Sequence, residues 1–481
     1  MRFDQHFIKG ILPEAVLPYT NFPEDIAFCV DTRTLKPGQI FVALPGLQAD
    51  GHDYILQALE KNAGGLFIAE HKKSLLETCD QNLLKNKLII IVNDTLQDFI
   101  KLACAWRAQF SYPVVGITGS VGKTSTKEIL ATILKLNNTV LCVSEGNQNT
   151  RVGIAINIFK MREYHHIAIF EMGISKRGEM AELSRIVRPT AAIVTCIGHA
   201  HMEGLGSLSD IALEKRDIFK YFGHDSIGII NGDQALLAHV GYIHPMIKFG
   251  SKTINQIQAR KVQIAGSEIS FVIKLYKNKY HITLKNPHEG SVMNALAASA
   301  AAYLLQIPSD KIIEGIQQPV RVVGRFEERE LGLQKGKIIH DCYNANPESM
   351  KASLLAFQKI NTRAKKIAVL GDMLELGVNS PFWHRQLGRF LRKVPSLNHL
   401  ILVGDMVKWT YKTVPVGITV DLVPSWKEAV EKLEHNLEQE SIVLVKGSRG
   451  IALENLVQKF TQPNVDVHAT SKQNSNIAQI A

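Results

Sequence analysis

The chain has 481 residues, too many for one ordinary hydrophobic core, so two to four domains are expected. Its composition, 46% hydrophobic and 21% charged, is typical of a globular protein in water, and its longest apolar stretch, Ala295 to Leu305, is too short to span a bilayer. The net charge of +10 comes from dispersed basic residues without a basic block that alternates with aromatics. This argues against nucleic acid and leaves a basic proteome or attraction to polyanionic small substrates.

Neither the N-terminus nor the cysteines indicate secretion. The opening segment, MRFDQHFIKG, has no apolar core, so no signal peptide is expected. The six cysteines are scattered singly without a CxxC pair. They favour a reducing compartment and argue against a zinc ribbon.

The first part of the chain mixes short apolar runs with turns. The pattern predicts strands at Gly38–Leu44, Leu66–Glu70 and Lys87–Val92, with a helix from His52 that closes before Leu66. A further helix is predicted to begin at an Asp94 cap.

From Val114 the pattern changes to apolar runs that alternate with helices, which indicates a parallel sheet covered on both faces. A long Ala-rich helix, Val292–Leu305, is expected near the end of this unit. The predicted strands lie within Val114–Thr118, His166–Gly173, Ala191–Gly198 and Ser226–Gly232.

A third unit begins near Arg321 and contains four strand-then-turn segments, which indicates a smaller doubly wound α/β domain. The predicted fold class is therefore α/β with three domains. Residues 462–481 are polar and aperiodic, which favours a flexible tail. The expected boundaries are 1–88, 89–320 and 321–461.

The stretch PVVGITGSVGKTSTKEIL predicts a phosphate-binding loop between a strand and a helix. Ile117 stands where the usual pattern has its first glycine, but the chemistry of the loop remains. Glycines turn backbone N–H groups toward an anion, the lysine supplies a point charge, and the threonine hydroxyl can bind Mg²⁺. The residues concerned are Thr118, Gly119, Ser120, Val121, Gly122, Lys123 and Thr124.

Four further polar residues lie at or after the ends of predicted strands or on the helix that follows. Glu171 ends a buried strand and is equally consistent with a Mg²⁺ ligand or a surface ion pair. His199 and His201 follow the next strand; they could be loop histidines, an unusual magnesium ligand or part of a zinc site, although no third zinc ligand stands at the right spacing. Lys215, on the following helix, taken alone would be a solvated lysine.

These segments together resemble the Mur ligase family, the ATP-dependent amide ligases of bacterial cell-wall precursor synthesis. The motifs that carry the resemblance are TGSVGKTS, EMG with GEM, HAHMEGLGS with IALEK, IINGD and VVGRFE. In that family the loop reads T-G-[ST]-x-G-K-[ST], so Ile117 fits it. DTRTLKPGQIFVALPG, HDCYNANPESM, VLGDMLELG and LVKGSRG resemble the branch that adds D-alanyl-D-alanine to UDP-N-acetylmuramoyl tripeptide.

The resemblance, over about residues 25–455, implies a UDP-substrate domain, a central ATPase domain and a C-terminal Rossmann-like domain. It implies an acyl-phosphate mechanism with ATP and Mg²⁺ in a bacterial cytoplasmic enzyme. The sequence itself shows no exposed heptad stripe, which favours a monomer. By position, Lys123 and Thr124 contact phosphate and magnesium, Glu171 and His201 bind magnesium, and Lys215 is carbamylated and helps to hold a second magnesium. Asn294 reads adenine, and Arg325 and Asp341 contact the nucleotide. The implied substrate residues are Asp31, Thr32, Arg33, Asp50, Gly51, His52, Asn344, Asn346, Pro347, Lys446, Ser448 and Arg449.

The sequence departs from the family at three places. Cys196 stands where the family often has Asn, and Gly290 stands where a histidine usually precedes the adenine-reading asparagine. Gly232-Asp233 replaces a common Asp-Asp pair. None of these changes removes an expected phosphate or metal ligand, so activity is expected to be retained.

Three other functions compete with this interpretation. A branch that adds one amino acid, or a folate polyglutamate ligase, more often carries a histidine where this chain reads DCYNANP. A P-loop switch or NTPase would turn over ATP without both co-substrates, and an inactive relative would have lost Lys123 or Lys215. The sequence does not distinguish diaminopimelate from lysine in the tripeptide.

Overall fold

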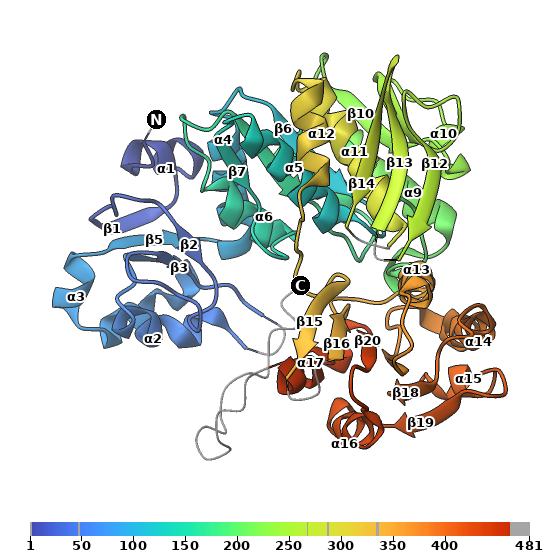
Figure 1. Cartoon of the computed structure of the whole chain (residues 1–481). Coiled ribbons are helices and arrows are strands. Elements are labelled where there is room, and N and C mark those ends of the chain that lie inside the picture. The colour runs from blue at the N-terminus through green and yellow to red at the C-terminus, as the bar shows by residue number, and fades with distance from the viewer. Residues whose placement is uncertain (1, 47–48, 267, 286–287, 333–335, 462–481) are drawn as a thin grey trace.

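The structure is a computed structural model that describes residues 2–46, 49–266, 268–285, 288–332 and 336–461. Three sheets form three domains, with the central domain joining the other two (Figure 1). The predicted tail, 462–481, lies outside the described residues. No helix within the described ranges is long and apolar enough to cross a membrane.

The N-terminal domain is a five-stranded sheet in which only the edge strand β1 runs antiparallel to its neighbour. Its last strand, β5, pairs with β1 and β4, so a boundary after residue 88 would separate β5 from its own sheet. The strands, in sheet order, are β1 (Val16–Thr20), β5 (Leu88–Val92), β4 (Gly65–Ala69), β3 (Ile40–Val42) and β2 (Phe28–Cys29); the helices are α1 (Gln5–Ile11), α2 (Ile55–Glu60) and α3 (Gln81–Lys85).

The central domain is a nine-stranded sheet, parallel over seven strands and extended by an antiparallel meander of β12, β13 and β14. The meander was not predicted. The strands, in sheet order, are β14 (Asn278–Leu284), β13 (Glu268–Leu275), β12 (Ile257–Ala265), β11 (Met246–Gly250), β10 (Ile227–Asn231), β9 (Ala191–Val194), β6 (Val114–Thr118), β8 (Ile167–Glu171) and β7 (Leu141–Val143).

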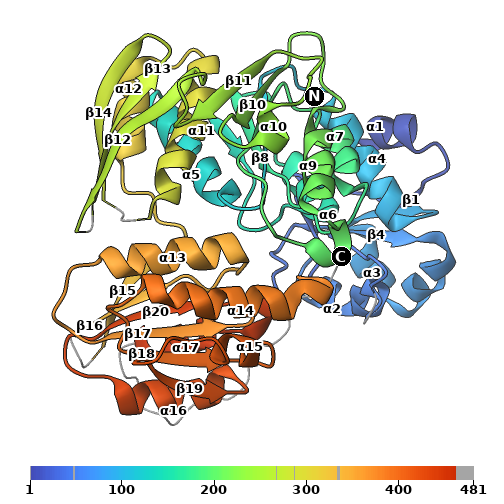
Figure 2. The same cartoon turned by 90° about the vertical axis from the view of Figure 1, so that its right-hand side faces the viewer.

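Helices cover both faces of the central sheet (Figures 1 and 2). The predicted cap of α4 is present, because Gln97 N donates to Asp94 Oδ1 at 2.9 Å. The predicted Ala-rich helix is α11, which packs against α5 and α12. The helices are α4 (Thr95–Arg107), α5 (Lys123–Leu136), α6 (Arg151–Ile158), α7 (Glu179–Val187), α8 (Met202–Leu205), α9 (Leu208–Arg216), α10 (Ala235–Ala238), α11 (Gly290–Leu304) and α12 (Ser309–Gln317).

The C-terminal domain is the predicted doubly wound unit, a six-stranded sheet with one antiparallel edge strand, β15. The strands, in sheet order, are β15 (Glu327–Leu331), β16 (Gly336–His340), β20 (Ile442–Lys446), β17 (Lys366–Gly371), β18 (His399–Val403) and β19 (Thr419–Val423); the helices are α13 (Pro347–Lys359), α14 (Ser380–Phe390), α15 (Lys408–Tyr411), α16 (Trp426–Asn436) and α17 (Glu454–Thr461).

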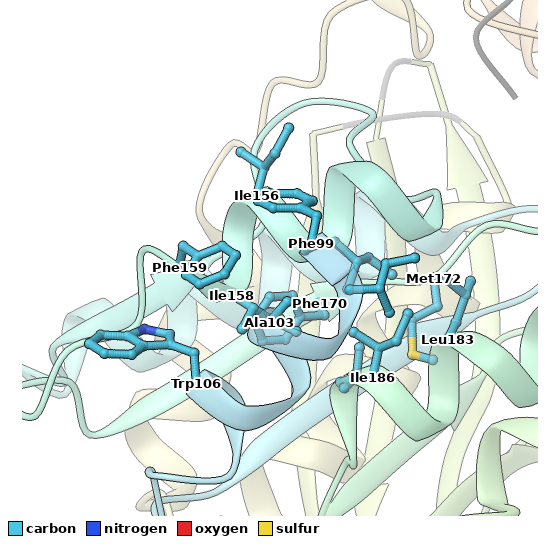
Figure 3. Close-up of a cluster of buried hydrophobic side chains, with 14 of the residues drawn as sticks. Phe99, Ala103, Trp106, Ile156, Ile158, Phe159, Phe170, Met172, Leu183 and Ile186 are labelled. Carbon is cyan, nitrogen blue, oxygen red and sulfur yellow. The ribbon is translucent and has the colours of Figure 1, made fainter. Parts of the chain in front are cut away.

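The first two domains share one apolar core. Helix α4 lies between their sheets, and its Phe99 ring lies 5.1 Å from Phe28 and 5.9 Å from Phe67 of the N-terminal sheet. On the other side, α4 side chains meet those of α6, α7 and β8, with Phe99, Trp106 and Phe159 among them (Figure 3). Because aromatic burial of this kind is strongly stabilising, these two domains should move as one body.

The C-terminal domain is attached differently. Its apolar clusters are separate from the shared core, although Met202 of the central domain packs against one of them. Helices α13 and α14 lie on the side turned toward the central domain (Figure 2). Polar contacts between the two domains involve Glu348 and Glu375. An interface of this type permits the two domains to move relative to each other.

Candidate active site

The predicted phosphate loop joins β6 to α5 in the required strand–loop–helix arrangement. Gly119 and Gly122 both have positive φ, 152° and 89°, a region in which a side chain would be strained. A Cβ at Gly119 would also collide with the Thr195 hydroxyl. Both glycines are therefore required by the loop's conformation, and the predicted loop is confirmed as a structural element.

The segment after β9 supports the loop from one side. Val121 N donates to Cys196 Sγ at 3.3 Å, and Thr195 Oγ1 donates to Val121 O at 2.6 Å. Gly198 N donates to Ser120 Oγ at 2.9 Å, and the hydroxyl donates back to Gly198 O at 3.0 Å. Cys196, the predicted departure from the family, is thus a partner of the loop backbone through its sulfur.

Lys123 is half-buried at the start of α5, and its Nζ donates to Gly119 O at 2.8 Å. Burial lowers its pKa, the neighbouring Glu171 opposes that shift, and Arg325 of the C-terminal domain adds to it. These electrostatic partners bring three predicted site residues together across two domains. The ammonium of Lys123 and the guanidinium of Arg325 together attract a polyanion such as a triphosphate.

Asn294, predicted to read adenine, lies on α11 directly over the phosphate loop. Thr126 Oγ1 donates to Asn294 Oδ1 at 3.4 Å, and a Cβ at Gly122 would collide with the same oxygen. Gly290, which stands before Asn294 where the family usually has a histidine, donates from its N–H to His288 Nδ1 at 3.1 Å. The His288 ring lies 5.5 Å from the Phe326 ring. A histidine ring is therefore present beside this position, supplied by a residue two places earlier.

Glu171 is buried at the end of β8, where Asn149 Nδ2 donates to its Oε1 at 2.9 Å. Its second oxygen, Oε2, is buried and has no hydrogen-bond partner within the described ranges. A buried carboxylate oxygen without a partner is costly unless something else binds it. The surface ion-pair alternative is therefore wrong.

Lys215 lies on α9 with only 1% of its surface exposed, so it is not the solvated lysine that the segment alone suggested. Burial and the nearby Lys123 lower its pKa to about 7. A large fraction of its amine is therefore neutral near neutral pH. A neutral amine is the form that reacts with CO₂.

His199 and His201 both meet carboxylates of the C-terminal domain. His199 N donates to Glu348 Oε2 at 3.0 Å, its Nδ1 contacts Glu348 Oε1 closely, and its ring lies 4.1 Å from Trp383. His201 Nδ1 lies 2.5 Å from Glu375 Oε2. No group of three or more potential metal ligands of the His, Cys, Asp and Glu types is preassembled in the described parts of the chain, so the zinc alternative gains no support.

Two arginines of the C-terminal domain flank one aromatic ring. The Arg325 guanidinium lies 4.1 Å from the centre of the Tyr343 ring, and that of Arg449 lies 5.6 Å from it. Burial raises the pKa of the Tyr343 hydroxyl, as does Glu171, while the two arginines oppose the shift. Tyr343 thus contacts both arginines and lies close enough to Glu171 of the central domain for that charge to affect its pKa.

The Asp341 side chain accepts hydrogen bonds from residues of its own C-terminal domain. Oδ2 accepts from Lys446 Nζ at 2.8 Å and from Ser353 Oγ at 2.5 Å, while Oδ1 accepts from Phe326 N at 3.2 Å. Burial acts to raise its pKa, but Lys446 outweighs burial and holds it below the usual value. Asp341 therefore fixes the segment that carries Arg325.

The predicted substrate residues near α13 have structural partners. Asn344 Oδ1 accepts from Ala345 N at 2.8 Å, and Asn346 caps α13 by accepting from Ser349 N at 2.8 Å, with Pro347 in the first turn. Ser448 Oγ accepts from Leu374 N at 2.9 Å. No ligand contact is needed to account for these side chains.

Asn346→Ala should reduce the free energy of unfolding by about 1 kcal/mol, because α13 loses its N-cap. The KM for the amine substrate should change less than twofold, since the side chain is committed to the helix. Thermal unfolding and steady-state kinetics check the two effects. A large rise in KM at unchanged stability would instead restore the predicted substrate role.

The predicted substrate residues of the N-terminal domain lie at the carboxyl end of its sheet, where ligands bind in open α/β sheets. Asp31 pairs with Arg33 at 2.7 Å, and Thr32 O accepts from Lys61 Nζ at 2.8 Å. His52 is buried, and its Nδ1 lies 2.6 Å from Asp50 Oδ1. Its Nε2 accepts a hydrogen bond from Ala69 N at 3.0 Å. Gly51, between Asp50 and His52, packs against the Leu44 backbone. His52 therefore holds the carboxyl end of β4, the middle strand of the sheet, while Asp31 and Arg33 follow the end of the edge strand β2.

Sequence reasoning missed Glu348, Glu375, Tyr343 and Trp383, which contact site residues across or near the domain interface. Tyr343 and Glu348 fall inside the motif HDCYNANPESM and Glu375 falls inside VLGDMLELG, so these two motifs gave a signal, whereas Trp383 lies in neither.

Comparison with known proteins agrees with this geometry. Residues 117–302 match the Mur ligase middle domain, and residues 324–449 match the Mur ligase, glutamate ligase domain. The UDP-N-acetylmuramoyl-tripeptide--D-alanyl-D-alanine ligase of Bacillus subtilis (strain 168) is 32% identical over 438 residues, 90% of this chain and 92% of that protein. The protein of the same name from Escherichia coli (strain K12) is 29% identical over 447 residues, 91% and 94% of the two chains.

Solved structures lead to the same family. MurF from Acinetobacter baumannii superposes with a TM-score of 0.77 at 26% identity, covering 90% of this chain and 93% of that one. MurF ligase from Thermotoga maritima in complex with ADP superposes with a TM-score of 0.75 at 27% identity, covering 91% of this chain and 97% of that one. The chain therefore belongs to the Mur ligase family.

Proposed function

We propose that the chain is the ADP-forming ligase that joins D-alanyl-D-alanine to UDP-N-acetylmuramoyl tripeptide and yields the UDP-pentapeptide of peptidoglycan synthesis. The name shared by its relatives supports the reaction. The observation that carries the proposal is the cluster of Lys123, Glu171 and Lys215 beside the phosphate loop, with Arg325 added by the C-terminal domain.

The first step has to activate a carboxylate, which does not react with an amine because oxide is a poor leaving group. Transfer of the ATP γ-phosphate to the tripeptide carboxylate forms an acyl phosphate. That transfer brings anions together, so positioning and charge neutralisation supply most of the catalysis. Lys123 and Arg325 provide positive charge from two sides, and the phosphate-loop N–H groups bind the phosphates.

Magnesium fits the donor atoms present. The unpartnered Glu171 Oε2 is a buried anionic oxygen of the type that Mg²⁺ prefers. Thr124, Glu171, His201 and a carbamate on Lys215 would hold the metal ions, which supply charge neutralisation on the transferring phosphoryl group. Carbamylation converts a cation into an oxygen ligand, and the lowered pKa of Lys215 supports it.

The second step is attack by the neutral amine of D-alanyl-D-alanine, and phosphate leaves through a tetrahedral intermediate. Water must be excluded, or the acyl phosphate hydrolyses. Closure of the C-terminal domain over the central domain would exclude it and would bring Arg325 and Arg449 to the site. The polar character of that interface, compared with the aromatic core joining the other two domains, supports movement there.

We also propose that the N-terminal domain binds the UDP-substrate near Asp31, Thr32 and Arg33, that the central domain binds ATP, and that the C-terminal domain helps to bind ATP and the incoming amine. All six cysteines are unpaired, which supports a location in the cytoplasm. A monomer is proposed as well.

Phosphate release measured with ATP, Mg²⁺ and UDP-N-acetylmuramoyl tripeptide should require D-alanyl-D-alanine and should yield the UDP-pentapeptide by mass. Lys123→Ala should reduce the rate by about 10³-fold, because a charge that stabilises the transferring phosphoryl group is lost. Among the described residues its Nζ donates a hydrogen bond to a loop carbonyl alone, so folding should survive.

Each other outcome has a distinct meaning. If a single amino acid replaces the dipeptide, the chain belongs to another branch of the family. If ATP turns over with neither co-substrate, the NTPase alternative is correct. A fully active Lys123→Ala variant would refute the assignment of the phosphate loop.

A further inference from the structure

The contact between His201 and Glu375 joins a predicted metal-binding histidine to a different domain. Glu375 Oε2 lies 2.5 Å from His201 Nδ1, a buried ring nitrogen with no other partner among the described residues, so this carboxylate is the group placed to face a proton on it. The side chains are 22% and 51% exposed, so the contact lies at the rim of the interface. A second link runs along the backbone, because Glu203 N donates to Glu375 O at 3.1 Å.

The Glu375 side of the contact is rigidly supported. Just before it, Asp372 accepts from the backbone N–H groups of Asp405, Met406 and Val407 at 2.7–3.1 Å. Met373 N donates to the fully buried His384 at 3.1 Å, and Leu374 N donates to Ser448 Oγ. Three consecutive residues before Glu375 are thus fixed by the body of the C-terminal domain.

Both members of the pair occupy strained backbone. His201 has φ 57° and Glu375 has φ 61°, in the left-handed region that residues other than glycine adopt uncommonly. Strain of this kind persists where the surrounding structure fixes a residue for a purpose. Here it is found at both ends of one interdomain contact.

The His201 side leads directly to the phosphate loop. The same segment contains Gly198, which exchanges two hydrogen bonds with Ser120 of that loop. The position of the histidine segment and that of the nucleotide-binding loop are therefore coupled by direct contacts.

We infer that Glu375 is a positioning residue for the ATP site: its carboxylate holds the proton of His201 on Nδ1 and leaves Nε2 as the ring nitrogen that can bind a metal ion. Carboxylates that orient metal-binding histidines in this way are common, but here the carboxylate comes from the domain that closes. The metal site would therefore be complete only when the C-terminal domain is docked. The inference rests on the proposed metal role of His201.

The test combines metal affinity with the spectrum of the imidazole in the full-length protein. Mn²⁺ binding in the presence of ADP is followed by electron paramagnetic resonance, and the His201 ring nitrogens are observed by NMR after ¹⁵N-histidine labelling. Glu375→Asn suits the left-handed backbone and removes the long carboxylate, so the fold should survive. Thermal unfolding confirms that it does.

Glu375→Asn should weaken Mn²⁺ binding about 10-fold and remove the Nδ1-protonated signature of His201. In a His201→Ala background it should have no further effect, since the two residues act through one contact. Glu431→Gln, an exposed substitution on α16, serves as the neutral control.

Glu348→Gln separates positioning from simple docking, because it loosens the neighbouring His199 contact without touching His201. If it weakens Mn²⁺ binding as much as Glu375→Asn, or if the His201 spectrum is unchanged in Glu375→Asn, the inference is wrong. If His201→Ala leaves Mn²⁺ affinity unchanged, the proposed metal ligand is wrong, while the spectrum still decides whether Glu375 sets the imidazole tautomer.

Discussion

Lys215→Met should lower the ligation rate by about 10²-fold or more while the protein stays folded. The methionine keeps the length and apolar stem of the lysine, which is 1% exposed, but it cannot take up CO₂. Loss of one preorganised charge-stabilising group typically costs about 10²–10³ in rate. The free energy of unfolding should be unchanged or higher, since burial already disfavours the charged amine and lowers its pKa to about 7.

Removing CO₂ provides the matched control for Lys215. In CO₂-stripped buffer the wild-type rate should fall and should recover when bicarbonate is added, whereas the Lys215→Met variant should not respond. Mass spectrometry or ¹³C NMR with labelled bicarbonate would detect the carbamate directly. A wild-type rate that is indifferent to CO₂, together with an active methionine variant, would refute the carbamate.

The sequence predicted those parts of the site that lie within one continuous segment. The phosphate loop has fixed spacing between a strand and a helix, and Gly119 and Gly122 occupy positions that the backbone requires. Glu171 was placed at a strand end, where open parallel sheets bind ligands. These features depend on the backbone conformation of one short segment, so the spacing of residues within that segment is enough to predict them.

Features that depend on contacts between distant segments were not predictable. No pattern indicates that Glu375 meets His201, because that contact exists only after two domains dock. Resemblance also assigned substrate roles to His52 and Asn346, and those roles stay predictions; the structure shows that His52 bonds the end of strand β4 and that Asn346 caps a helix. A motif shows that a residue type occurs at a position, but it does not separate ligand binding from a structural role.

The antiparallel meander was missed for a different reason. Strand β13 alternates between buried and exposed residues and pairs with β14 across a tight turn, a pattern that does signal a hairpin. The strands predicted for this domain were the continuous apolar runs, which indicate buried parallel strands. Alternating edge strands do not share that signature.

Glu171→Gln should reduce phosphoryl transfer by about 10²–10³-fold and should leave the free energy of unfolding unchanged or increased. In the native structure Oε2 is buried without a partner in the described ranges, which costs about 1–3 kcal/mol unless a metal ion occupies the site. An amide of the same shape has no negative charge to bury. The rate and its dependence on Mg²⁺ concentration measure the first effect, and calorimetric unfolding without metal measures the second.

Glu179→Gln provides the contrast, because this nearby carboxylate is satisfied. Its Oε2 accepts from Ser175 N at 2.7 Å and from Lys176 N at 3.0 Å, so its neutralisation weakens charge-assisted hydrogen bonds. It should lose stability and keep its Mg²⁺ dependence, the opposite of Glu171→Gln. A carboxylate that costs stability and supports the rate binds a ligand, whereas one that supports stability alone maintains the fold. If Glu171→Gln destabilised the protein and left the Mg²⁺ dependence unchanged, Glu171 would belong to the second group.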